Sequence, residues 1–159
     1  MSLDIDRDPP RAAMSRPSGR MLESINPGTT LSKRAARRLI QRAFVLTGRD
    51  KRVREHIRTT QLTTLWVLED WNLAWTVFLH RGRLEVARRP GKHPDVTFSW
   101  PTAEEFFHQA ERVGDSLVQV EILPALEHPR FFQPLLRGFF TALRHVLSNP
   151  VDDQGVSLL

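Results

Sequence analysis

The spacing of the hydrophobic residues changes twice along this 159-residue chain, and that change limits the possible folds more than any other feature. From Ser32 the apolar residues recur every three or four positions, which is typical of a helix. Between Gln61 and Trp100 they alternate, which is typical of strands, and after Pro101 the helical spacing returns. Helices and strands in separate blocks predict an α+β protein.

The helical spacing covers four segments, which are 32–48, 50–58, 102–114 and 133–149. Ser32 can cap the first helix, and Gly48 predicts its end. Thr102 and Glu105, three positions apart, form a capping box at the start of the third helix. These signals predict helices on both sides of the strand block.

The alternating pattern covers four segments, which are 62–68, 73–80, 83–88 and 95–100. Short turn signals such as Arg81-Gly82 separate them, so we predict an antiparallel meander. A fifth strand is predicted over 117–122, with a helical turn as the alternative. The expected fold is an antiparallel sheet of about five strands that helices cover on one face.

The ends of the chain differ from its centre. Residues 1–30 contain four prolines and little periodic hydrophobicity, so we predict a flexible N-terminal arm. Residues 31–150 are predicted to form one domain, and residues 151–159 a C-terminal tail. Neither a targeting signal nor an apolar run of the roughly 18 residues that span a membrane is present, so a cytoplasmic protein is expected.

The net charge of +5 is unevenly distributed. Residues 1–58 carry 14 basic and 6 acidic side chains, and segment 33–58 alone carries ten basic side chains against Asp50 and Glu55. Such a segment is most often a solvated face, but a cationic helix can also dock on anionic lipid headgroups. Nucleic acid is the less favoured partner, because side chains that read bases are scarce there. The predicted docking residues are Arg34, Arg37, Arg38 and Arg42.

Several catalytic classes are excluded by composition. The chain has no Cys, so disulfides, thiolate metal sites and cysteine nucleophiles are impossible, and it has no Tyr. The pair Glu105 and His108 has the spacing of a di-iron ligand pair, but such sites need a second pair that this sequence lacks. We expect Glu105 to cap its helix and His108 to pair with Glu104 or Glu111. No catalytic residue, metal ligand or cofactor is predicted, and the protein is expected not to be an enzyme.

Large aromatic residues are concentrated in the strand block and on the last two helices. Rings in such positions usually fill the core between a sheet and its helices, but they can also wall a cavity. The residues that we select as a possible apolar wall are Trp75, Val77, Phe98, Trp100, Phe106, Phe107, Leu136, Phe139 and Phe140.

A set of short motifs in the strand block resembles the sterol carrier protein domain. The motifs are Asn72-Leu73-Ala74-Trp75, Gly82-Arg83-Leu84-Glu85-Val86 and Pro94-Asp95-Val96-Thr97-Phe98-Ser99, and a helix start at 102–107 follows them. The chain departs from that family in having Gly114-Asp115 before its predicted fifth strand rather than after it.

The resemblance implies a mostly antiparallel five-stranded sheet covered by helices, with an apolar tunnel that holds a fatty-acyl or isoprenoid-like lipid. Bacterial members of the family include lipid carriers and accessory factors for isoprenoid quinone synthesis. The expected function is therefore non-enzymatic binding or transfer of an apolar lipid. The alternative is a protein- or nucleic-acid-interaction module that uses segment 33–58.

Overall fold

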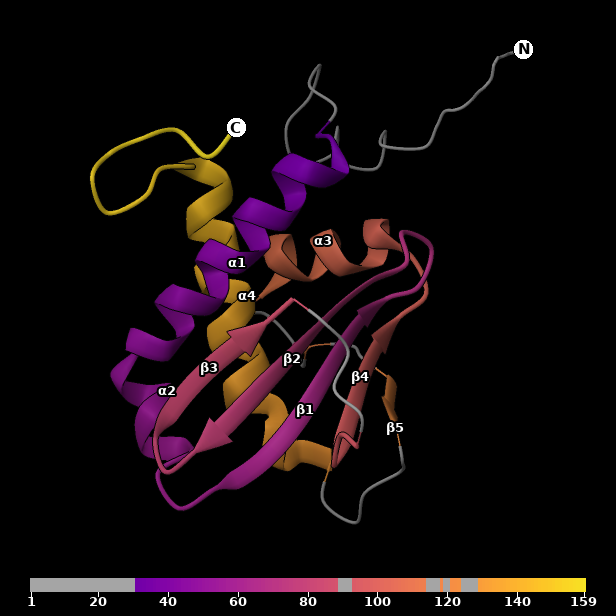
Figure 1. Ribbon diagram of the computed structural model, residues 1–159, viewed down its shortest axis with the longest axis vertical. Coiled ribbons are helices and arrows are strands. Elements are labelled where there is room, and N and C mark those ends of the chain that lie inside the picture. The colour runs from indigo at the N-terminus through magenta and orange to yellow at the C-terminus, as the bar shows by residue number, and fades with distance from the viewer. Residues whose placement is uncertain (1–30, 89–92, 114–117, 119–120, 124–128) are drawn as a thin grey trace. The chain divides into compact units, whose positions relative to one another are not determined.

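The computed structural model describes residues 31–88, 93–113, 118, 121–123 and 129–159 (Figure 1). The predicted arm over 1–30 and part of the predicted strand over 117–122 lie outside the described residues. The chain separates into two compact units, Met1–Arg38 and Leu39–Leu159, and each is described by itself.

In the first unit, the described residues begin helix α1 (Lys33–Arg49). The Ser32 hydroxyl accepts a hydrogen bond from the Ala35 N–H at 3.1 Å, and the Ser32 carbonyl accepts one from the Ala36 N–H at 2.9 Å. The predicted N-terminal cap is therefore confirmed. The predicted end at Gly48 is wrong by one residue, because α1 continues to Arg49.

The second unit contains the rest of α1 together with the other helices and the strands. The helices are α2 (Lys51–His56), α3 (Ala103–Arg112), the short 3₁₀ helix η3 (Pro129–Phe132) and α4 (Gln133–Ser148). The strands are β1 (Gln61–Leu68), β2 (Leu73–His80), β3 (Arg83–Ala87), β4 (Val96–Trp100) and β5 (Glu121–Leu123). The predicted α+β class is confirmed.

The strands of the described residues form one sheet in the order β3-β2-β1-β4-β5. The pairs β1–β2, β2–β3 and β4–β5 are antiparallel, but β4 pairs with β1 in parallel. The predicted antiparallel meander is therefore wrong, because the sheet is mixed. Alternation tells which face of a strand is buried, but it carries no information about which neighbour the strand pairs with.

The parallel pairing is held at its start by Asp95, just before β4. The Asp95 carboxylate accepts a hydrogen bond from the Thr63 N–H at 2.8 Å, and the Asp95 N–H donates to the Thr63 carbonyl at 2.8 Å. At the other end, the N–H groups of Glu69 and Asp70 donate to the carbonyls of Trp100 and Pro101. The hairpin of β2 and β3 thus acts as the crossover connection that a parallel pair requires.

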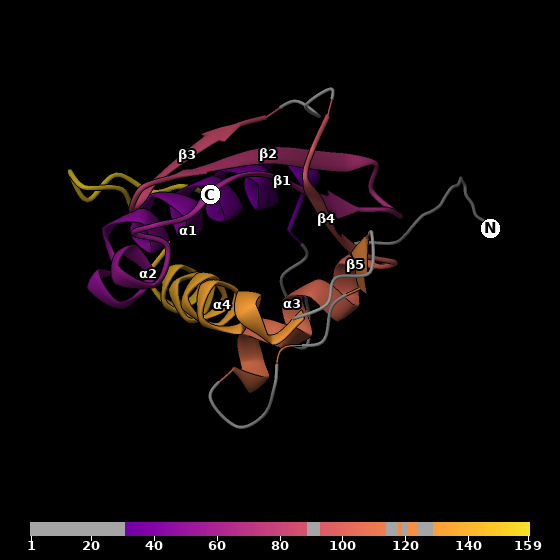
Figure 2. The ribbon, with the colours of Figure 1, turned by 90° about the horizontal axis from the view of Figure 1, so that it is seen from below.

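The core lies between the sheet and the helices. Trp66 on β1 is in register with Trp75 on β2 and with Phe98 on β4, so their side chains share one face of the sheet. Helices α2, α3 and α4 lie on one side of the sheet (Figure 2). All three of these aromatic residues are at most 2 % exposed, so the interior is aromatic and densely filled.

Helix α2 packs closely against α4 at a glycine. A Cβ atom placed on Gly138 would clash with Cγ2 of Val53, the buried residue of α2. Glycine in a helix interior costs roughly 1 kcal/mol relative to alanine. Its presence here is explained by the close approach of Val53.

The predicted C-terminal tail is joined to α1 by two ion pairs within the second unit. Residues Val151 and Ser157 form an antiparallel bridge around a turn. The Asp153 carboxylate accepts hydrogen bonds from Arg49 at 2.8 Å and from Arg42 at 2.9 Å. These bonds from Arg49 and Arg42 hold the pKa of Asp153 well below its usual range.

Candidate functional site

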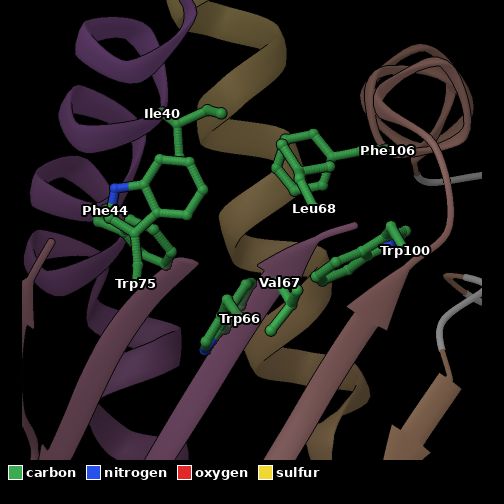
Figure 3. A pocket seen from close by; sticks show the side chains of 8 residues that line it. All are labelled: Ile40, Phe44, Trp66, Val67, Leu68, Trp75, Trp100 and Phe106. Carbon is green, nitrogen blue, oxygen red and sulfur yellow. The ribbon is translucent and has the colours of Figure 1, made fainter. Parts of the chain in front are cut away.

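A narrow apolar gap lies between the sheet and the helices at the end where β1 and β4 finish (Figure 3). Ile40 and Phe44 approach it from α1, and Phe106 approaches it from α3. The strands supply Trp66, Val67, Leu68, Trp75 and Trp100. Every lining side chain is either apolar or an indole, so the gap favours apolar material.

The gap is closed by these side chains. The space not occupied by atoms is about 170 Å³, including the part open to solvent, but no point in it admits a sphere the size of a water molecule. The apolar cavity that the sequence predicts is therefore not open in this structure. Any ligand of the gap would have to displace side chains that line it.

Rings from the sheet and rings from the helices meet around the gap. The ring centroid of Trp66 lies 5.0 Å from that of Phe44 and 5.0 Å from that of Phe139 on α4. The Trp100 and Phe106 centroids are also 5.0 Å apart. All three pairs are T-shaped, which is a favoured arrangement for aromatic rings.

The indole N–H groups in this region differ in their hydrogen bonding. The Trp66 N–H donates to the Thr64 hydroxyl at 2.9 Å, and that hydroxyl donates to the Val77 carbonyl at 2.9 Å. The N–H groups of Trp75 and Trp100 are buried, and the described part of the chain offers neither of them an acceptor. A buried donor without a partner costs roughly 1–3 kcal/mol. Two of the three tryptophans that line the gap therefore carry this cost.

The residues selected from the sequence as a wall divide into two groups. Trp75, Trp100 and Phe106 line the gap. The other six are buried in the surrounding core, and they are Val77, Phe98, Phe107, Leu136, Phe139 and Phe140. The aromatic pattern thus identified core positions but did not separate those at the gap from those elsewhere.

Five lining residues were missed by the sequence prediction, namely Ile40, Phe44, Trp66, Val67 and Leu68. The sequence contains a signal for some of them. Ile40 and Phe44 are one helical turn apart on the apolar stripe of α1, and Trp66 and Leu68 lie two positions apart on the buried face of β1. The signal for placing these segments side by side was absent, because it depends on the tertiary fold.

The predicted docking arginines lie on α1. In the first unit, the side chains of Arg34, Arg37 and Arg38 are exposed. In the second unit, the Arg42 side chain is only 16 % exposed and is paired with Asp153. The charge of Arg42 is thus compensated locally.

The polar residues considered for catalysis make local contacts on α3. The Thr102 hydroxyl accepts a hydrogen bond from the Glu105 N–H at 3.1 Å, which confirms the predicted cap of α3. Nε2 of His108 lies 3.9 Å from a carboxylate oxygen of Glu111, which confirms one of the two predicted partners of His108. Within the described ranges, no group of three or more His, Asp or Glu side chains is arranged to hold a metal ion.

None of the helices in the described part of the chain combines the length and the apolar character that a membrane span requires. Comparison of the chain with protein-family models, with curated proteins and with solved structures gives no match in any of the three.

Proposed function

We propose that this protein binds the apolar chain of a lipid, either acyl or isoprenoid, between its sheet and its helices, and that it does so without catalysis. The observation that carries this proposal is the apolar gap whose lining includes two tryptophans with unpaired, buried N–H groups. A core that has no role beyond stability gains nothing from such groups. The proposal accordingly places the opening of the core at this gap.

The driving force for binding is desolvation of the lipid chain. Each buried methylene contributes about 0.8 kcal/mol. A chain of ten or more carbons therefore gains several kcal/mol, which can offset the displacement of a few side chains. The surrounding rings remain available to line the opened space and to contact the lipid chain.

The unpaired N–H groups lower the cost of opening. When the ring of Trp75 or Trp100 turns, its N–H can reach water or an oxygen of the ligand head group. The roughly 1–3 kcal/mol that each unpaired donor costs in the closed state is then recovered. The closed state is thereby less favoured than a fully satisfied core would be.

The architecture also agrees with the resemblance to the sterol carrier protein domain. In the described residues, three of the four strand pairings are antiparallel, and helices lie on one side of the sheet. This supports, as part of the proposal, a sterol-carrier-like carrier or an accessory factor in lipid or quinone metabolism. The exposed Arg34 and Arg37 would contribute peripheral contact with anionic membranes.

Native mass spectrometry of the full chain purified from cells tests the proposal, because a bound lipid adds its own mass. A second assay measures binding of the fluorescent fatty acid dansylundecanoic acid and its displacement by oleate. We expect a lipid adduct in the first assay and saturable, displaceable binding in the second. A protein that carries no adduct and does not bind the probe would refute the proposal.

A matched pair of variants locates the site. Leu68→Phe adds bulk to the lining of the gap, whereas Leu79→Phe adds the same bulk to a buried position of β2 that does not line it. Overpacking costs each variant roughly 1–3 kcal/mol of stability. We expect Leu68→Phe to lose probe binding and Leu79→Phe to keep it. Equal binding by the two folded variants would place the lipid elsewhere.

A further inference from the structure

A second depression, which we name the basic groove, lies where α2 meets the turn between β2 and β3. It has a volume of about 540 Å³ and is lined by Lys51, Arg54, Glu55, Arg58, Arg81, Gly82 and Arg83. Five of these residues are cationic and one is acidic, so the lining carries a net charge of +4 at neutral pH. Among the described residues, no aromatic or aliphatic side chain lines it.

The groove is built by hydrogen bonds that fasten the β2–β3 turn to the end of α2. The Arg81 N–H donates to the Thr60 carbonyl at 2.8 Å, and the Gly82 N–H donates to the Ile57 carbonyl at 3.0 Å. A Cβ atom on Gly82 would lie 3.5 Å from the Arg54 carbonyl oxygen. Arginines that are 27 positions apart in the sequence, such as Arg54 and Arg81, are thereby fixed in one site.

The turn itself has an unusual residue. Arg81 has φ +50° and Gly82 has φ +89°, which are the left-handed angles of a type I′ hairpin turn. Asn, Asp or Gly normally occupies the first position, because a side chain there costs roughly 1–2 kcal/mol. Arg81 therefore adopts a backbone conformation that is unfavourable for an arginine.

Within the described residues, the cations of the groove are not paired with carboxylates. Among the residues that the structure describes, no side-chain hydrogen bond or ion pair connects Lys51, Arg54, Arg58, Arg81 or Arg83 to a carboxylate. Arg42 and Arg49, by contrast, share the carboxylate of Asp153. Glu55 offsets only one of the five positive charges, so the remaining like charges repel one another, and a bound anion lowers that repulsion.

We propose that the basic groove binds an anion that carries two closely spaced phosphate groups. Guanidinium groups present paired N–H donors that match phosphate oxygens, and four arginines surround the groove. The described residues that line this local depression include no aromatic ring on which a base could stack, which disfavours a nucleic acid strand. The anion can be free, such as diphosphate, or borne by a lipid, such as cardiolipin.

Isothermal titration calorimetry of the full chain with inorganic diphosphate tests whether the groove binds a free anion. The titration is done at about 0.1 M salt, where exposed charges more than about 10 Å apart are screened from each other. Sedimentation with cardiolipin-containing vesicles, against pure phosphatidylcholine vesicles, tests the lipid-borne source. We expect saturable binding in at least one arm, with no binding to phosphatidylcholine. Binding in neither arm overturns the proposal.

Arg81→Gly is the decisive variant, because glycine suits φ +50° and the fold should not be weakened. We expect it to lower the affinity by about tenfold, as the loss of one charged hydrogen bond would. Arg144→Ala is the matched control, since it removes one exposed arginine of α4 that lies outside the groove. We expect that control to change the affinity less than twofold.

The remaining outcomes are equally decisive. An equal loss in Arg81→Gly and Arg144→Ala would mean that only the overall charge matters, and it would overturn the proposal. So would binding to single-stranded DNA in the absence of binding to diphosphate and to cardiolipin. The proposal does not depend on lipid binding in the apolar gap, because Leu68→Phe, which tests the gap, leaves the groove residues unchanged.

Discussion

The two ends of the hairpin formed by β1 and β2 differ in the chemistry of the residues around them and in the free volume there. At the end where Leu68 pairs with Leu73, the interior is apolar and has no room for a water molecule. At the opposite end, where Gln61 pairs with His80, the adjoining groove is cationic and measures about 540 Å³. The first end is a packed region that must open to bind a ligand, and the second is already open.

This difference reflects how each region is assembled. The apolar gap is made by residues that strand and helix periodicity bury, and their rings contact each other directly. The basic groove is made by exposed residues that backbone hydrogen bonds of a turn bring together. Substitutions near the gap should therefore strongly change the stability of the fold. Substitutions near the groove should change ligand binding rather than stability.

The largest effect is expected for Phe139→Ala. Phe139 is fully buried, and its ring lies 4.5 Å from that of Phe44 and 5.0 Å from that of Trp66. Truncation should lower the free energy of unfolding by about 3–5 kcal/mol, measured by urea denaturation. Thr141→Ala on the exposed side of α4 should change it by less than about 0.5 kcal/mol. A loss below about 1 kcal/mol for Phe139→Ala would contradict the packed description of the apolar end.

The next effect concerns the contact between α4 and α2, the helix that supplies several groove residues. Gly138→Ala should lower the free energy of unfolding by about 1–3 kcal/mol, because the new Cβ meets Val53. Gly48→Ala in α1 is the control, since its Cβ would be in ordinary contact with Leu84 at 3.6 Å. That control should gain up to about 1 kcal/mol from the helix preference of alanine. Thermal denaturation should show a lower midpoint for Gly138→Ala and a higher midpoint for Gly48→Ala than for the wild type.

A smaller effect separates the tryptophans. Trp66→Phe removes a paired N–H and deprives Thr64 of its donor, whereas Trp100→Phe removes an unpaired one. Both variants lose a similar area of buried ring, so the difference between their free energies of unfolding reports the effect of the hydrogen bond. We expect Trp66→Phe to be less stable than Trp100→Phe by about 1–2 kcal/mol in urea denaturation. Equal losses would show that the Trp100 N–H has an acceptor.

The prediction of the fold from the sequence succeeded where one segment decides the outcome. The caps at Ser32 and Thr102 and the alternation of β1 to β4 are local signals, and the structure contains them. The parallel partner of β4 was missed, because that pairing depends on hydrogen bonds between Thr63 and Asp95, which are 32 positions apart.

The sites were less predictable than the fold. Periodicity shows that Phe106 and Phe107 are buried, but only the packing of α3 decides which one faces the gap. Segment 33–58 was recognised as basic, yet Arg81 and Arg83 of the groove lie outside it. The charge of Arg42 was counted as available, although Asp153 at the far end of the chain compensates it.

The smallest effect is the pH dependence of the Asp153 contact. Its pKa is lowered in the folded protein by hydrogen bonds from Arg49 and Arg42, so the contact stabilises the fold fully above the unfolded pKa of about 3.9. The stabilisation is lost as the pH falls through the lower folded pKa. We expect the denaturation midpoints of the wild type and Asp153→Asn to differ at pH 5 and to converge toward pH 2. A difference that stays constant over this range would contradict the pKa shift.

The absence of tyrosine has a spectroscopic consequence for the apolar gap. At excitation wavelengths longer than those that phenylalanine absorbs, the intrinsic fluorescence comes from four tryptophans, and three of them line the gap. Indoles in an apolar interior emit at shorter wavelengths than indoles in water. Each opening of the gap that admits water should therefore shift the emission to longer wavelengths without any attached dye. The protein thus contains its own optical reporter of the state of its core.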